Sequence, residues 1–194
     1  MATDPRAYKK HVLELRGRPV TLVNSEFFAA ALKKEWQEGQ KRQVPLPADR
    51  PKVVDLYVHW LYTGKIFVRP LLEETGENNT ESAIIVELFL FGEKVQDGNL
   101  KDAAIDALIM ATNTQDKDQK LWYPTNTIED AYNGTPASSP LRRLLVDMYI
   151  SHGHGPWIKG TEPIEFLVDL SRALIDSRRD KPNPRSDQLK ANRV

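Results

Sequence analysis

Apolar residues that recur with the period of an α-helix constrain the fold of this chain more than any other feature. Six segments place their apolar side chains on one helical face, at residues 25–36, 51–63, 82–95, 99–111, 139–148 and 161–177. Three shorter apolar segments have the length of strands and stand at Val12–Leu15, Val20–Val23 and Arg42–Leu46. We therefore expect an α+β fold that is mostly helical, with a few short strands early in the chain.

Residue types at the ends of these segments predict where several helices begin and end. Ser25, Asp49 and Asn99 carry side chains that commonly accept hydrogen bonds at helix N-termini. Gly39 and Gly64 follow two of the segments, where glycine commonly ends a helix. These residues predict helices from residue 25 to 36, from 51 to 63, and from 99 onward.

The periodicity also predicts which side chains face the core. The inward residues are expected to be Phe27, Phe28, Ala31, Leu32 and Trp36 in the first helix, Val54, Tyr57, Val58 and Leu61 in the second, and Ile164, Leu167, Val168 and Leu174 in the last. Trp60, Trp122 and Trp157 are expected in the core. Trp36 ends its helix beside a polar segment, so it either anchors a contact with a partner or closes the helix against a neighbouring element.

Composition excludes several classes of function. The 194 residues include 27 Lys and Arg and 27 Asp and Glu, so the chain lacks the basic field expected of a nucleic-acid-binding protein. Cysteine is absent, which rules out disulfides, thiol catalysis and cysteine-ligated zinc. No apolar run approaches the roughly 20 residues of a membrane span, and residues 1–10 lack the apolar part of a signal peptide. We expect an intracellular protein, cytoplasmic or nuclear, without a nucleic-acid or membrane partner.

Catalytic and cofactor motifs are not found in the sequence. It contains no phosphate-binding loop, no dinucleotide-binding glycine pattern and no hydrolase or zinc-protease signature. The only constellation that suggests metal or enzymatic chemistry combines His152 and His154, which flank Gly153, with Glu162. A solvent-exposed turn is the simpler interpretation of these residues. We predict no catalytic residue, no cofactor and no metal site.

Three segments read together resemble a BTB/POZ domain of the fungal type. They are Ser25–Leu32 with Trp36–Gly39, Val44–Pro47 with Val53–Gly64, and Leu88–Leu108. The sequence Trp-Leu-Tyr-Thr-Gly at residues 60–64 is the most specific of these signals. Asn133–Pro136 and Ser139–Asp147 resemble the helical extension of fungal proteins with this domain, so that the resemblance covers roughly residues 20–175.

The resemblance implies a particular division of the chain. Residues 1–111 would form the BTB/POZ-like domain, residues 112–179 a helical extension, and residues 180–194 a disordered tail. The front of the family's domain is matched incompletely, since Gly17 stands where the family carries a histidine. Residues 1–111 are also few for a complete domain with its front hairpin. Family members form homodimers through this region, so the resemblance leaves homodimerisation open.

The function that the resemblance implies is protein–protein interaction and not catalysis. Many BTB/POZ proteins are substrate adaptors of cullin-based ubiquitin ligases, and others act in transcription. Adaptors commonly carry a hydrophobic residue and a glutamate separated by one position after the second helix, and Trp36-Gln37-Glu38 matches that pattern. These three residues are therefore the predicted protein-binding site, with a cullin as a candidate partner. The alternatives are a transcription-associated scaffold, a small enzyme or metal-binding protein, and a structural module without a partner.

Overall fold

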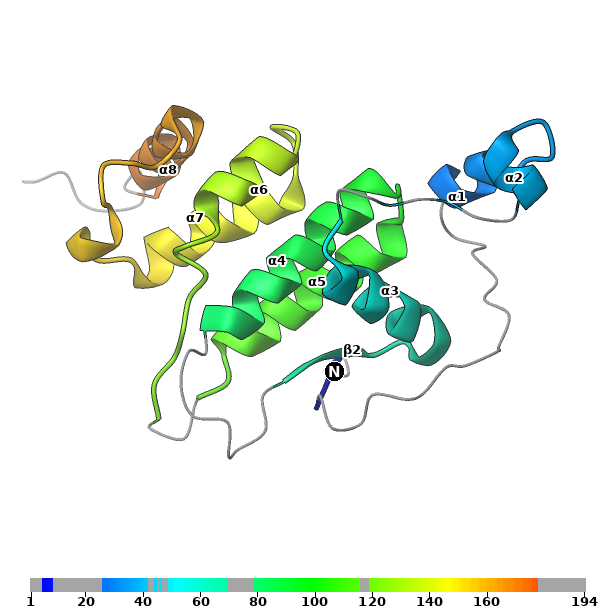
Figure 1. Ribbon diagram of the computed structural model, residues 1–194. Helices are drawn as coiled ribbons and strands as arrows, with labels where there is room; N and C mark the ends of the chain where they lie inside the picture. Colours follow the sequence, from blue (N-terminus) through cyan, green and yellow to red (C-terminus); the bar gives the residue numbers. More distant parts are fainter. Residues whose placement is uncertain are drawn as a thin grey trace, which may run out of the picture.

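A computed structural model describes residues 5–8, 26–41, 44, 46, 49–69, 79–115 and 119–177 of the protein (Figure 1). The described elements in chain order are β1 (Arg6–Tyr8), α1 (Glu26–Ala31), α2 (Gln37–Lys41), α3 (Pro51–Thr63), β2 (Ile66–Arg69), α4 (Asn79–Lys94), α5 (Gly98–Thr112), α6 (Ile128–Gly134), α7 (Pro140–His152), the 3-10 turn Gly155–Trp157, and α8 (Ile164–Asp176). The prediction of a mostly helical fold is therefore confirmed. Among the described helices, none is both long and apolar enough to cross a membrane.

The predicted strands have different outcomes. Val12–Leu15 and Val20–Val23 lie outside the described residues, as does the predicted tail at 180–194. In the third segment, Val44 and Leu46 are described and are not part of a strand. The strand β2, which follows α3 directly, was not predicted.

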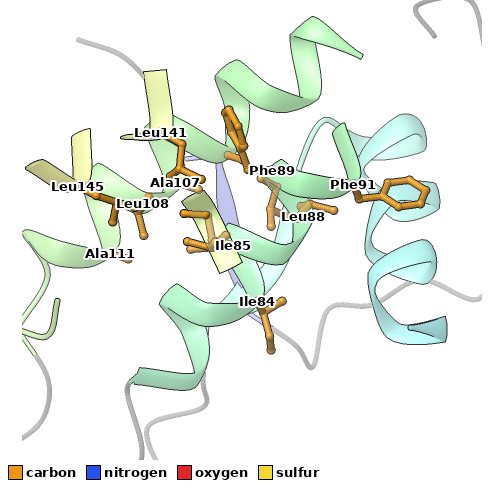
Figure 2. Packing of buried hydrophobic residues seen from close by; sticks show 14 of the residues in the cluster. Ile84, Ile85, Leu88, Phe89, Phe91, Ala107, Leu108, Ala111, Leu141 and Leu145 are labelled. Atoms are coloured by element: carbon orange, nitrogen blue, oxygen red, sulfur yellow. The ribbon is translucent and has the colours of Figure 1, made fainter. Parts of the chain in front are cut away.

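The centre of the molecule is the pair of neighbouring helices α4 and α5, with α7 packed over it (Figure 2). Their buried side chains meet in one cluster, and those labelled in the figure are Ile84, Ile85, Leu88, Phe89 and Phe91 from α4, Ala107, Leu108 and Ala111 from α5, and Leu141 and Leu145 from α7. A Cβ atom on Gly92 would lie 2.9 Å from the Lys101 side chain, so the absence of a side chain permits this close helix approach. The buried cluster continues without a break from Phe28 to Leu170.

The two short strands join the start of the described chain to α4 and α5. β1 pairs with β2 in parallel, and the Ile66 N–H donates to the Pro5 carbonyl at 2.9 Å. Arg6 is buried in β1, and its guanidinium donates to Glu81 at 3.1 Å and to Thr114 at 2.8 Å. Because Glu81 lies in the first turn of α4 and Thr114 follows α5, this buried arginine holds the strand pair against both helices.

Helix ends agree with the prediction at some positions and not at others. Pro51 is the first residue of α3, and Gly64 ends that helix in the left-handed conformation at φ 64°. The residue that precedes α3 is Arg50, so the predicted cap at Asp49 is wrong; Asp49 instead pairs with Lys94 at 2.5 Å.

The N-terminus of α5 is a second correction. Asp97, and not the predicted Asn99, caps this helix, because its carboxylate accepts the Leu100 N–H at 3.1 Å. The same carboxylate accepts the Tyr57 hydroxyl at 3.0 Å and is fully buried. Asp97 therefore links the start of α5 to the middle of α3.

A buried arginine organises the predicted helical extension. Arg142 lies in α7, and its guanidinium donates to the Thr135 hydroxyl at 3.0 Å, to the Thr135 carbonyl, and to the Tyr132 carbonyl at 2.6 Å. It also donates to Glu165 of α8 at 2.7 Å and lies 4.4 Å above the Tyr132 ring. The adjacent Ser139 caps α7 through the Leu141 N–H, as its place before Pro140 predicts. One side chain thus connects α6, α7 and α8.

The buried faces of two helices differ from the prediction. In α3 the buried residues are Val53, Leu56 and Tyr57, and only Tyr57 was predicted to face inward. In α8 the buried residues are Phe166 and Leu170, which were not predicted. The predicted inward residues of α8 are exposed or half-buried: Ile164 is 80% exposed and Val168 39%. The prediction was therefore wrong for Ile164 and Val168, whereas the predicted Leu167 does pack against the core, partly buried.

The tryptophans are also less buried than predicted. Trp122 is 38% exposed, and both Trp60 and Trp157 are only partly buried against the core. The buried aromatic side chains of the extension are instead Tyr132, Tyr149 and Phe166, and the Tyr149 and Phe166 rings meet at 4.9 Å in an edge contact. The aromatic core of this region is thus built from tyrosine and phenylalanine.

Replacing Tyr149 by phenylalanine should leave stability at pH 7 unchanged or raise it by up to about 1 kcal/mol. The Tyr149 hydroxyl is buried and has no hydrogen-bond partner among the described residues, so its removal leaves nothing unpaired. Burial, with a smaller contribution from the Glu162 charge, raises the pKa of Tyr149 to about 12.

The same substitution should reduce the loss of folding stability at alkaline pH. In the unfolded chain Tyr149 loses its proton near pH 10, whereas in the folded chain it keeps the proton until its pKa of about 12. Its contribution to the free energy of unfolding is therefore complete below pH 10 and is lost as the pH rises from 10 toward 12. Urea unfolding at pH 9 and pH 11 should show about 1 kcal/mol less loss in Tyr149→Phe than in wild type. The half-buried Tyr123→Phe serves as control. Equal losses in wild type and Tyr149→Phe would contradict this prediction.

Candidate functional site

The predicted binding residues lie where the chain turns from α1 into α2. The predicted single helix does not reach Trp36: α1 ends at Ala31, and α2 begins at Gln37. Between them, the Lys33 N–H donates to the Ala30 carbonyl and the Trp36 N–H donates to the Lys33 carbonyl at 3.0 Å. The prediction that Gly39 ends a helix is also wrong, because Gly39 lies inside α2.

This turn places the three predicted residues at the start of α2. The Trp36 carbonyl accepts the Gln40 N–H at 3.1 Å, so Trp36 stands directly before the first turn of the helix. Its side chain is 60% exposed, and that of Gln37 is also exposed. Glu38 is half-buried in the first turn, where the free N–H groups of a helix favour a negative charge. Trp36 and Glu38 therefore both lie at the start of α2, Trp36 directly before its first turn and Glu38 within it.

Gly39 determines how closely α2 returns to the turn. A Cβ atom at this position would lie 2.1 Å from the Lys33 carbonyl oxygen, a distance that no side chain tolerates. The Gln40 side chain adds a hydrogen bond to the Lys34 carbonyl at 3.3 Å. Only glycine at residue 39 therefore permits the observed fold of α2 onto the turn, and with it the exposed position of Trp36.

A row of aromatic rings connects α1 to the core. Phe28 is buried and stacks on Tyr57 of α3, with ring centroids 6.1 Å apart, and Phe27 meets Phe28 edge-on at 5.1 Å. Tyr57 in turn contacts Trp60 at 6.1 Å and Phe91 of α4 at 5.2 Å. Figure 2 shows Phe91 pointing from α4 toward α3. The exposed turn is thus tied to the core through Phe28.

The surface of the turn combines apolar and charged groups. Leu32 was predicted to face the core but is 38% exposed, and it lies on the same turn as Trp36. Lys33, Lys34 and Glu35 are exposed beside them. Figure 1 shows α1 and α2 at one edge of the molecule, far from α8. Two large exposed apolar side chains within a charged turn resemble the centre and rim of a protein-binding surface.

The residues of the alternative metal or enzyme interpretation are not brought together. His152 ends α7 and stacks on Tyr123, with ring centroids 4.9 Å apart, and His154 contacts Trp157 at the same distance. Glu162 accepts the backbone N–H groups of Lys159 and Gly160, which lower the pKa of its carboxyl. No group of three or more His, Asp or Glu side chains suited to a metal ion occurs in the described part of the chain. Each of the three side chains therefore has a local structural contact.

Comparison with protein-family models, with curated proteins and with solved structures gives no match for this chain. The resemblance to BTB/POZ domains therefore depends on the sequence segments quoted above. The functional proposal depends on the same segments and on the geometry of the turn between α1 and α2.

Proposed function

We propose that this protein is a protein–protein interaction module of the BTB/POZ type. The observation that carries the proposal is the 60% exposure of Trp36 on a turn that is itself anchored to the core. An exposed tryptophan on a firmly held turn loses little conformational entropy on binding and supplies a large apolar contact. The proposed binding site is Trp36, Gln37 and Glu38, with Leu32 beside them.

A narrower proposal is that the module is an adaptor that binds a cullin through this site. It is supported by the match of Trp36-Gln37-Glu38 to the adaptor pattern and by the placement of Glu38 in the first turn of α2. The helices α6, α7 and α8 would then be available to hold a substrate. The other proposal of the same class is a transcription-associated scaffold, which would use the same surface for a different partner.

The cullin proposal predicts measurable binding that depends on Trp36. Calorimetric titration with a cullin N-terminal domain should release heat at micromolar concentrations. Trp36→Ala should weaken the affinity at least tenfold, because truncation of a central aromatic anchor commonly costs 2 kcal/mol or more. Glu38→Ala should weaken it several-fold. Absence of heat at high micromolar concentration would rule out the cullin and leave the scaffold as the proposal.

Two controls separate binding from folding in this titration. Ile109 on α5 is an apolar residue that is exposed to about the same degree as Leu32, at 37%, so Ile109→Ala tests the loss of an exposed apolar side chain elsewhere. Gly39→Ala tests the shape of the turn, because the added Cβ atom would displace α2 while leaving Trp36 and Glu38 present. We expect Ile109→Ala to bind as wild type and Gly39→Ala to bind as weakly as Trp36→Ala.

A further inference from the structure

α8 carries apolar side chains on two opposite faces. Phe166 and Leu170 are buried against α6 and α7. Ile164, Val168 and Ile175 lie on the opposite side of the helix and are 80%, 39% and 62% exposed. Figure 1 shows α8 at the outer edge of the molecule, next to α7. A helix that is apolar on both sides is ordinarily covered on both sides.

The exposed residues follow the spacing of a helix–helix contact. Ile164, Val168, Ser171 and Ile175, which we name the α8 seam, are separated by four, three and four residues. This is the alternation by which two helices interlock side chains along a shared seam. Ser171 is small, and its hydroxyl donates to the Leu167 carbonyl of its own helix at 2.6 Å, so it presents no unpaired donor to a neighbour.

The seam is complementary to itself when two copies run antiparallel. In such a pair the seam residues of the two helices run in opposite order. Ile164 of one copy therefore lies opposite Ile175 of the second copy, and Val168 lies opposite Ser171 of the second copy. Ile164 and Ile175, the two most exposed apolar residues of α8, would then cover each other across the contact between the two copies. No gap or charged residue falls in the row.

The residues beside the seam are complementary in charge in the same arrangement. Glu165 and Arg172 lie along one side of the seam, and an antiparallel pair brings Glu165 beside Arg172 of the second copy, twice by symmetry. Leu167 and Leu174 lie along the other side of the seam, where Leu167 of one copy meets Leu174 of the second copy. A parallel pair would instead place Leu167 beside Arg172. Arg172 is exposed and has no ion pair within the described part of the chain, so its charge is available.

We propose that the α8 seam binds a second copy of this chain in an antiparallel, two-fold symmetric contact. Because the same patch serves both partners, the contact closes on itself and yields a dimer. The seam is only two heptads long, so the dissociation constant is expected on the order of 100 µM. This inference is independent of the surface at Trp36, which lies at the other edge of the molecule.

Sedimentation equilibrium of the full chain, up to about 1 mM, tests the association. We expect a monomer–dimer equilibrium that Val168→Asp and Ile175→Asp each weaken at least tenfold and that Ile109→Asp leaves unchanged. A chain that stays monomeric up to the highest concentration would overturn the proposal, and so would a dimer that both seam variants retain. If another segment of the same chain covers the seam, the protein stays monomeric and Val168→Asp unfolds at lower urea concentration, which also overturns it.

Cross-linking tests the orientation, since the chain has no cysteine of its own. In the proposed dimer the two copies of residue 164 are about 16.5 Å apart along the helix axis, at 1.5 Å per residue over eleven residues, whereas residue 164 of one copy lies opposite residue 175 of the other. A short bismaleimide should therefore link a mixture of Ile164→Cys and Ile175→Cys into dimers but link neither variant efficiently alone. Equal yields from each variant alone and from the mixture would contradict the antiparallel arrangement.

Discussion

Arg142→Ala is expected to lower the free energy of unfolding by about 3–5 kcal/mol, the largest effect of any substitution considered. The side chain of Arg142 is buried and makes hydrogen bonds to α6, to the loop after it and to α8. Its removal leaves the carbonyl groups of Tyr132 and Thr135 without this donor in a region from which water is excluded. Urea unfolding followed by circular dichroism measures the change.

Two further variants separate the causes of that loss. Arg143 is exposed, and among the described residues its side chain donates only to the Ser138 carbonyl, so Arg143→Ala should change stability by less than about 0.5 kcal/mol. Glu165 is 71% exposed in its side chain, so Glu165→Ala should cost less than about 1 kcal/mol despite its ion pair with Arg142. A loss below about 1 kcal/mol in Arg142→Ala would contradict the role that we assign to the buried guanidinium.

Asp97→Ala is expected to cost about 2–4 kcal/mol, the second largest effect. The substitution removes the N-terminal cap of α5, which is commonly worth about 1 kcal/mol, and it removes an acceptor of the Tyr57 hydroxyl inside the core. Because Tyr57 also stacks on Phe28, we expect the turn that carries Trp36 to be loosened as well. Thermal unfolding and the binding titration should therefore both respond to this change.

Asn99→Ala is the matched control for Asp97→Ala, because the sequence alone favours Asn99 as the cap. The structure places Asn99 inside the first turn of α5 with its side chain exposed, so its replacement should change stability by less than about 0.5 kcal/mol. Tyr57→Phe should cost about 1 kcal/mol, since it removes the hydrogen bond to Asp97 and keeps the ring. A larger loss in Asn99→Ala than in Asp97→Ala would contradict the assignment of the cap.

Helix ends were predictable where the residue type allows only one role. Gly64 adopts a left-handed conformation that few other residues accept, and Pro140 can stand in a helix only at its start, so both positions were predicted correctly. Asp97 and Asn99 have the same capping chemistry two residues apart, so the sequence could not separate them. The break between α1 and α2 was missed because Lys33, Lys34 and Glu35 are all compatible with a helix.

Burial was harder to predict than secondary structure, for two physical reasons. In α8, Phe166 and Leu170 lie on one side and Ile164 and Val168 on the other, so periodicity alone does not tell which side is covered. In α7, apolar periodicity gives no information about Arg142, which is buried because backbone carbonyl groups accept hydrogen bonds from its guanidinium. Such burial depends on loops that meet only in the folded chain.

The local structure of the candidate binding site was not predicted from the sequence. Trp36, Gln37 and Glu38 were chosen from a short sequence pattern, and the structure places them where the turn after α1 enters α2, not at the end of one continuous helix. The exposure of Leu32 could not be predicted, since it depends on the early end of α1. The role of Gly39 was also missed, because a glycine after a helical segment ordinarily indicates its end.

Capture of partners from a native extract, with wild type, Trp36→Ala and Ile109→Ala compared side by side, tests the central claim most directly. If the protein is an interaction module that binds through the turn between α1 and α2, wild type and Ile109→Ala should retain the same partner and Trp36→Ala should lose it. Circular dichroism should show that all three proteins are equally folded. Retention of the same set of proteins by wild type and by folded Trp36→Ala would contradict the claim.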